Sequence, residues 1–234
     1  MATIFDDPDR APPPLDLLAL EGVSLFSRMF RSIGRLGERG PADGPKVMVL
    51  PGFLASDRIT LGLQRALAAA GYRVTGWGMG LNRGLQADSL DRLAANIETF
   101  GEGKKIILVG WSLGGVFARE VAKVRPDLVE RVITMGSPFS GDARGNNAWR
   151  VYEWVAGHPV DDPPIPLNLT EKPPVPTLAI WSRRDGVISP ASARGAAGES
   201  DEQVELQCSH MGFGVSGRAF PAIVAEVRRF AGKP

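Results

Sequence analysis

From residue 46 onward, short apolar runs alternate with stretches whose apolar residues recur at helical spacing. The short apolar runs predicted as strands span residues 47–50, 73–75, 106–109, 132–135, 178–181 and 204–206. The predicted helices span residues 57–70, 86–100, 113–124, 145–156 and 217–231. Strands that alternate with helices need crossover connections, which produce a mostly parallel sheet covered on both faces. The sequence therefore predicts an α/β fold with about six strands.

The chain of 234 residues has the length of one domain with a single core. We expect residues 41–234 to form that domain. Residues 1–14, acidic and then proline-rich, are predicted to be a disordered lead-in. Apolar residues at helical spacing predict an amphipathic helix over residues 15–39, in an N-terminal segment that ends at residue 40. We expect this helix to pack on the body of the domain, on a partner chain or on a membrane surface.

Charge and composition exclude several classes of protein. A net charge of +1, from 27 Lys and Arg against 26 Asp and Glu, offers no attraction to a phosphate backbone, so we expect no nucleic-acid partner. One cysteine and two histidines are too few for an internal disulfide or a zinc site, and we expect no metal. The sequence contains no apolar stretch of about 18 residues and no signal-peptide pattern, so we expect a cytoplasmic protein without a spanning segment.

The segment Gly110-Trp111-Ser112-Leu113-Gly114 joins a predicted strand to a predicted helix. A sharp turn at such a junction holds a serine hydroxyl above the edge of the sheet. The glycines two residues before and two after the serine leave room where strand and helix approach. Because the pattern alone arises readily by chance, the strand–turn–helix context carries the prediction that Ser112 is a nucleophile.

A serine nucleophile needs a histidine base and a carboxylate that orients it. His210 follows the last predicted strand, where a parallel sheet brings it near Ser112, whereas His158 lies in a proline-rich stretch. Asp185 follows the preceding predicted strand and is the candidate acid, with Asp142 as a geometric rival. The predicted catalytic set is Ser112, Asp185 and His210.

Acyl transfer also needs donors for the oxyanion. The backbone N–H of Leu113, at the start of a predicted helix, supplies one. The loop Pro51-Gly52-Phe53-Leu54 follows the first predicted strand, and we expect the Phe53 N–H to supply the second.

The glycine-rich segment at residues 76–80 follows a predicted strand without matching the dinucleotide-binding pattern, because Leu81 stands where its third glycine would be. We expect no nucleotide cofactor there. The segment is instead predicted to be a flexible wall of the site, with Asn82 and Arg83 hydrogen-bonding within it.

Residues 138–176 separate two predicted strands, are rich in proline, and are too long for a simple crossover. We expect a lid-like insertion whose aromatic helix folds over Ser112 and makes an apolar pocket for short to medium acyl chains. The residues expected at the substrate are Trp111, Phe139, Trp149 and Trp154, with Tyr152, Leu167 and Leu169 completing the pocket.

These motifs resemble the α/β-hydrolase superfamily, in particular small bacterial serine esterases and lipases. The resemblance covers residues 46–231 and lies in Leu50-Pro51-Gly52-Phe53, Gly110-Trp111-Ser112-Leu113-Gly114-Gly115, Gly136-Ser137-Pro138-Phe139, Asp185-Gly186 and Ser209-His210. The chain lacks room before Val47 for the two usual opening strands, and Pro-Gly-Phe replaces a His-Gly-Gly-Gly oxyanion motif. The resemblance therefore implies a minimal, six-stranded α/β-hydrolase fold.

The resemblance implies hydrolysis of a small-molecule carboxylic ester through an acyl-enzyme on Ser112, with His210 moving the proton, Asp185 holding His210, and no cofactor. The serine argues against dehalogenases and epoxide hydrolases of this fold, which use Asp at that position. An acyltransferase, thioesterase, lactonase or peptidase could use the same triad. From another class, a catalytically silent interaction module would require that one triad position be lost.

Overall fold

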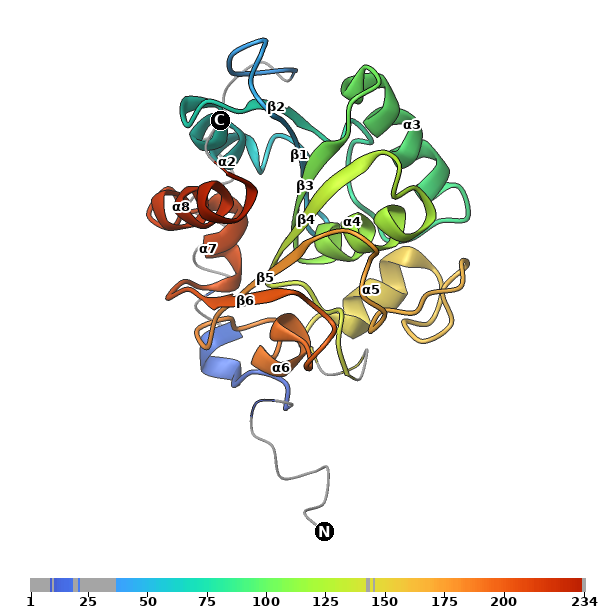
Figure 1. The fold of residues 1–234 in the computed structure, drawn as a ribbon. Helices are drawn as coiled ribbons and strands as arrows, with labels where there is room; N and C mark the ends of the chain where they lie inside the picture. Colours follow the sequence, from blue (N-terminus) through green and yellow to red (C-terminus); the bar gives the residue numbers. More distant parts are fainter. Residues whose placement is uncertain are drawn as a thin grey trace.

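A six-stranded parallel sheet forms the centre of the molecule (Figure 1). The structure, a computed structural model, describes Asp9, residues 11–18, Glu21, residues 37–141, Arg144 and residues 146–232. In that part of the chain the strand order is β2-β1-β3-β4-β5-β6. The strands are β1 Lys46–Leu50, β2 Arg73–Gly76, β3 Ile106–Trp111, β4 Val129–Met135, β5 Thr177–Trp181 and β6 Glu202–Glu205. The predicted α/β class and the six predicted strands are confirmed.

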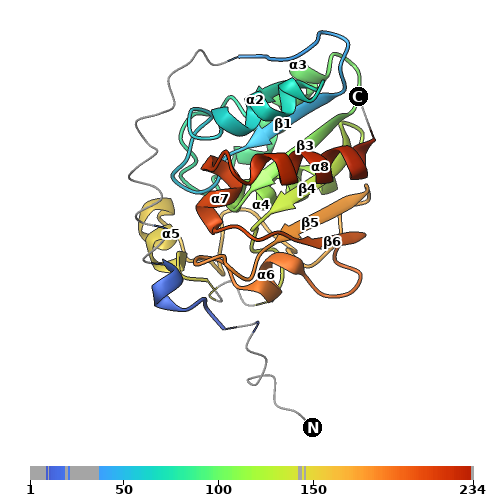
Figure 2. The same cartoon turned by 90° about the vertical axis from the view of Figure 1, so that its left-hand side faces the viewer.

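Helices cover both faces of the sheet. One face carries α2 Leu61–Ala69, α7 His210–Val215 and α8 Phe220–Ala231, and Figure 2 shows these three helices in front of the strands. The other face carries α3 Ser89–Gly101 and α4 Leu113–Val124. The remaining described helices with bounds, α5 Trp149–Ala156 and α6 Pro190–Arg194, lie in the connections on either side of β5.

Alternation along each strand divides the core between the two faces. Val47 and Val49 of β1 pack in the cluster that includes α2 and α8, whereas Met48 and Leu50 pack in the cluster that includes α3 and α4. Successive strand side chains point to opposite faces, so a strand covered on both sides must be apolar throughout. This double coverage explains the apolar runs of the inner strands, whereas the edge strands β2 and β6 contain polar residues.

The carboxyl ends of β1 and β3 are neighbours, and the chain leaves them toward opposite faces. The segment after β1 leads to α2, and the turn after β3 leads directly into α4. In open parallel sheets a ligand crevice forms at such a switch point, outside the carboxyl ends of the strands. The topology therefore brings the loop at Phe53 and the turn at Ser112 to one crevice.

The N-terminal segment differs in part from expectation. Residues 15–18 are helical, but residues 19, 20 and 22–36 of the predicted helix lie outside the described residues. The helix does not extend to its predicted end, because Arg39 pairs antiparallel with Val74 of the edge strand β2. Residues 1–8 and 10 of the predicted disordered lead-in also lie outside the described residues.

The described part of that lead-in packs on the domain. Pro13 is buried, and its carbonyl accepts a hydrogen bond of 2.9 Å from Asn147 Nδ2. The carbonyl of Asp9 accepts another of 2.9 Å from the Ala191 N–H in α6. These contacts order the backbone that they join. None of the described helices combines the length and apolar character needed to cross a membrane.

Candidate active site

Ser112 occupies a strained turn between β3 and α4. Its backbone has φ 54° and ψ −127°, a left-handed φ that side-chain-bearing residues rarely adopt. The Ser112 N–H donates to the Met135 carbonyl at 2.8 Å, and the Ser112 carbonyl accepts from Gly115 N–H at 2.9 Å. These bonds hold the turn on both sides.

The two motif glycines are required by close backbone approach. A Cβ at Gly110 would lie 2.4 Å from Gly115 Cα, and one at Gly114 would lie 2.3 Å from the Leu50 carbonyl oxygen. Neither neighbour is a side chain that could move aside. The structure thus agrees with the prediction that strand and helix approach too closely at these two positions for any residue but glycine.

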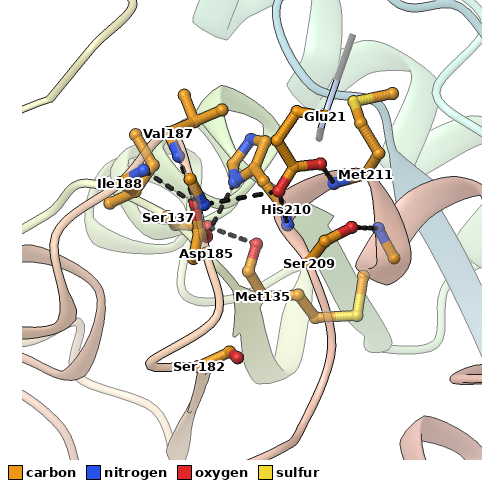
Figure 3. A network of polar contacts seen from close by, with 12 residues as sticks. Glu21, Met135, Ser137, Ser182, Asp185, Val187, Ile188, Ser209, His210 and Met211 are labelled. Carbon is orange, nitrogen blue, oxygen red and sulfur yellow. Dashed lines mark hydrogen bonds and ion pairs between the residues drawn. The ribbon is translucent and has the colours of Figure 1, made fainter. Parts of the chain in front are cut away.

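Asp185 and His210 form a buried pair. His210 Nδ1 and Asp185 Oδ2 are 2.8 Å apart, and the other carboxylate oxygen, Oδ1, accepts from the N–H groups of Val187 and Ile188 at 2.8 Å each (Figure 3). Asp185 follows β5, and His210 is the first residue of α7, after β6. The carboxylate is thus fixed at both oxygens and orients the imidazole.

The environment raises the pKa of His210 above its ordinary value. Burial alone would lower this pKa, but the charge and hydrogen bond of Asp185, with the charge of Glu21, outweigh burial. The imidazole is consequently a stronger base than one in water.

Trp111 connects the Ser112 turn to His210. Its indole Nε1–H donates to the His210 carbonyl at 3.0 Å, and the two ring centroids are 5.7 Å apart. A hydrogen bond between Ser112 Oγ and His210 is not among those of the described residues. Such bonds are often long in enzymes without substrate and tighten when it binds.

The backbone N–H groups of Phe53 and Leu113 are free to bind a ligand. Within the described part of the chain neither donates to an acceptor, and both residues line the cavity at Ser112. Gly52 lies against the serine, because a Cβ there would be 3.1 Å from Ser112 Cβ. The loop after β1 therefore lies directly beside the Ser112 turn.

Asn82 holds this loop. Its buried side chain donates from Nδ2 to the Pro51 carbonyl at 2.8 Å and accepts at Oδ1 from the Gly84 N–H at 3.1 Å. Its backbone carbonyl accepts from the Leu54 N–H at 2.7 Å. No bond of the Asn82 amide to residues 76–80 is found among the described residues, so that prediction is wrong: the amide joins Pro51, in the loop after β1, to Gly84, in its own connection.

The glycine-rich segment does not line the cavity at Ser112. Asp57 accepts from the N–H groups of Trp77 and Gly78 at 2.9 and 3.1 Å, and the buried Trp77 ring packs edge-on against Phe117. Burial raises the pKa of Asp57, and the two backbone bonds oppose that rise. Because none of residues 76–80 lines that cavity, the prediction that this segment is a wall of the site is wrong.

An apolar cavity lies over Ser112. It contains about 620 Å³ of empty space, part of which is open to solvent. The described residues that line it are mostly apolar. They come from the loops after β1, β2, β4 and β5, from the Ser112 turn and α4, from α5 and from the segment that follows α5: Phe53, Leu85, Ser112, Leu113, Val116, Pro138, Asn146, Ala148, Trp149, Tyr152, Val160, Leu167, Leu169 and Ile188. Insertion residues thus form much of its wall.

The predicted substrate residues divide into two groups. Trp149 lines the cavity, as do Tyr152 and two leucines of the insertion, but Trp154 is 84% exposed. Residues three apart share a helix face, as Trp149 and Tyr152 do, whereas Trp154 is two residues further and faces away. The assignment of Trp154 to the pocket is therefore wrong.

Trp111 and Phe139 are buried beside the cavity without lining it. Trp111 packs against His210. Phe139 lies under the guanidinium of Arg119, whose Cζ is 4.1 Å from the centroid of the Phe139 ring. Both were predicted to touch substrate. Both instead support elements that surround the site.

The alternative catalytic residues lie elsewhere or outside the described part of the chain. His158 lies near Tyr152, with its Nε2 3.1 Å from the Leu85 carbonyl oxygen, and Asp142 is outside the described residues. Burial, with the charges of Asp185 and Glu21, raises the pKa of Cys208 to about 12, so its thiol stays protonated. No cluster of three or more potential metal ligands occurs among the described residues.

Comparisons with solved structures identify similar folds. Carboxylesterase CesB from Bacillus subtilis is 15% identical over 94% of this chain and 98% of that chain, with a TM-score of 0.60. A monoacylglycerol lipase from Paleococcus ferrophilus is 18% identical over 83% of this chain and 98% of that chain, with a TM-score of 0.58. A thioesterase domain from the curacin biosynthetic pathway is 16% identical over 82% of this chain and 93% of that chain, with a TM-score of 0.56. A search of curated proteins found no match.

The sequence itself carries the family assignment. The family profile described as alpha/beta hydrolase fold matches residues 45–172, which is more than half of the chain. That range contains the first four strands, the Ser112 turn and the helix at the cavity. Together with the parallel sheet, this match shows that the chain belongs to the α/β-hydrolase fold family.

Proposed function

We propose that this chain is a serine hydrolase that cleaves carboxylic esters with short to medium acyl chains. The observation that carries the proposal is the strained backbone of Ser112, at φ 54°, on the floor of an apolar cavity. Strain of this kind persists only where the surrounding structure enforces it, and it is typical of functional sites. Ser112 is the nucleophile, His210 the base and Asp185 the orienting acid.

In the first half of the reaction, His210 Nε2 accepts the Ser112 hydroxyl proton while Ser112 Oγ attacks the ester carbonyl carbon. The carbonyl oxygen becomes an oxyanion that accepts hydrogen bonds from the Phe53 and Leu113 N–H groups. The C–O bond to the alcohol then breaks, and the alcohol leaves with the proton from His210. The product is an acyl group bound to Ser112.

In the second half, a water molecule gives its proton to His210 and attacks the acyl carbon. The resulting oxyanion uses the same two N–H donors, and its collapse breaks the bond to Ser112 Oγ, which recovers the proton from His210. Asp185 remains a carboxylate and stabilises the imidazolium in both halves. The acid is released and the enzyme is regenerated.

The cavity supports the substrate class. Its walls are mostly apolar, which suits the acyl and alkyl parts of an ester. The similar structures include a carboxylesterase and a monoacylglycerol lipase, which supports esters as substrates, and also a thioesterase domain, so thioesters are the alternative that the assay must distinguish.

The test is hydrolysis of p-nitrophenyl esters from acetate to palmitate by the wild type and by Ser112→Ala, with His158→Ala as the control. We expect an optimum at short or medium chains, loss of nearly all turnover in Ser112→Ala, and little change in the control. Substantial turnover by Ser112→Ala would refute the nucleophile. An optimum at palmitate would refute the acyl range, and faster cleavage of matched thioesters would favour thioesterase activity.

A further inference from the structure

Glu21 is a buried carboxylate that contacts both loops of the Asp185–His210 pair. Only 5% of the residue is exposed. Oε1 accepts from the His210 N–H at 2.5 Å and from the Gly186 N–H at 3.3 Å, and Oε2 accepts from the Met211 N–H at 2.9 Å (Figure 3). One side chain from the N-terminal segment thus binds the backbone beside the acid and the backbone of the base.

These contacts complete the start of α7. The first N–H groups of a helix have no partner inside it. In α7 the Ser209 hydroxyl accepts from the Gly212 N–H at 3.2 Å, and Glu21 binds the N–H groups of His210 and Met211. A negative charge at this end of a helix is also favoured electrostatically. The position of His210 therefore depends on a residue 189 positions away in the sequence.

The chain near Glu21 is packed closely against the acid loop. A Cβ at Gly186 would lie 2.5 Å from the Leu17 carbonyl carbon, so only glycine fits at the residue after Asp185. Asp9 of the same segment lies 2.8 Å from an Arg183 guanidinium nitrogen. The N-terminal segment is thus attached to the Asp185 loop at several points.

We propose that Glu21 is a positioning residue of the active site, whose carboxylate locks the Asp185 loop to the start of α7 and adds a second negative charge near His210. This inference rests on the proposed function for its effect on turnover. Glu21 does not line the cavity, so it acts through His210 and not on the substrate. The hydrolase needs its N-terminal segment for this reason.

The substitution Glu21→Gln keeps the size of the side chain and removes its charge. An amide has one acceptor oxygen, so its nitrogen meets a backbone N–H that it cannot bind. The charged groups that act on His210 are Asp185 and Glu21, and Cys208 lies two residues before it in the chain. The Cys208 thiol stays neutral, so Glu21→Gln leaves Asp185 as the remaining charge that raises the pKa of His210.

The first readout needs no activity. The His210 imidazole is titrated by NMR in the wild type, Glu21→Gln and Asp16→Asn. The variant His158→Gln leaves His210 as the one histidine of the chain and so identifies the His210 resonances. Asp16→Asn is the matched control, since Asp16 is an exposed acid on the same segment. We expect the pKa of His210 to fall in Glu21→Gln and to remain unchanged in Asp16→Asn. An unchanged titration in a folded Glu21→Gln protein would overturn the proposal.

The second readout is ester turnover. We expect kcat of Glu21→Gln to fall about tenfold or more with KM nearly unchanged, because misplacing a catalytic group affects the reaction more than binding. The acidic limb of kcat/KM should move to lower pH, which a loss of stability alone would not produce. Wild-type kcat in Glu21→Gln would overturn the positioning role. A wild type without turnover would refute the proposed function and leave the NMR result to decide the role of Glu21.

Discussion

Replacing Asn82 by alanine tests how the loop after β1 is held. The change removes the hydrogen bond from Nδ2 to the Pro51 carbonyl and the one from the Gly84 N–H to Oδ1, both within the buried interior. A buried acceptor and a buried donor then lose their partners. Each unpaired group costs about 1–3 kcal/mol, so the free energy of unfolding should fall by about 2–6 kcal/mol.

The effect on turnover follows from the position of Phe53. Its N–H is one of the two donors proposed for the oxyanion, and it lies two residues after Pro51. Loss of one such donor typically lowers kcat by about 10²–10³-fold. Because the backbone bond from Leu54 N–H to the Asn82 carbonyl remains, the loop is displaced and not unfolded. We expect a fall in kcat of about tenfold to a hundredfold.

The assay combines urea unfolding with p-nitrophenyl butyrate hydrolysis at a temperature where the variant is folded. Arg83→Ala is the matched control, since Arg83 is the exposed neighbour of Asn82. We expect the control to match the wild type in both measurements. A folded Asn82→Ala protein with wild-type kcat, or one that loses less than about 1 kcal/mol of stability, would refute this account of the loop.

Three further predictions follow from the site. Asp185 and Glu21 raise the pKa of His210 above 6.5, and the base must be neutral to act. The value of kcat/KM should therefore increase with pH, and the midpoint of this increase should lie above 6.5; a midpoint below 6.5 would contradict the assignment of His210 as the base. Tyr152→Ala removes a side chain from the wall and so enlarges the cavity, which should move the optimum to esters with longer acyl chains, whereas Trp154→Ala should leave it unchanged. Equal chain-length profiles in the two variants would contradict the claim that Tyr152 and not Trp154 lines the cavity. Arg119→Met removes the hydrogen bonds from the guanidinium to the Glu199 and Glu171 carbonyls, at 3.0 Å each, and should lower the melting temperature by several degrees. A melting temperature equal to that of the wild type would contradict this prediction.

Several elements could be predicted from the sequence because local signals encode them. Strands such as β1 are buried on both faces, so their residues form apolar runs that stand out from the surrounding helical patterns. The glycines around Ser112 mark a turn whose geometry has few solutions. The order of strand ends then sufficed to predict that Asp185 and His210 meet.

Other features depend on contacts that no local signal encodes. Glu21 reads as one acid among many, and its role depends on where a distant segment lies. The short helices α6 and α7 are too brief for a helical period to appear. Trp154 is different: the spacing from Trp149 and Tyr152 was available in the sequence and would have placed it on the other side of α5.

The most direct test of the account is the site of covalent attachment. The wild type is mixed with p-nitrophenyl acetate, quenched with acid within the first turnover, digested and sequenced by mass spectrometry, with Ser112→Ala treated in parallel. We expect one acetyl group on Ser112 of the wild type and none on the peptide from Ser112→Ala. Acetylation at another residue during turnover, or turnover without any acyl-enzyme, would contradict the claim that Ser112 is the nucleophile of this hydrolase.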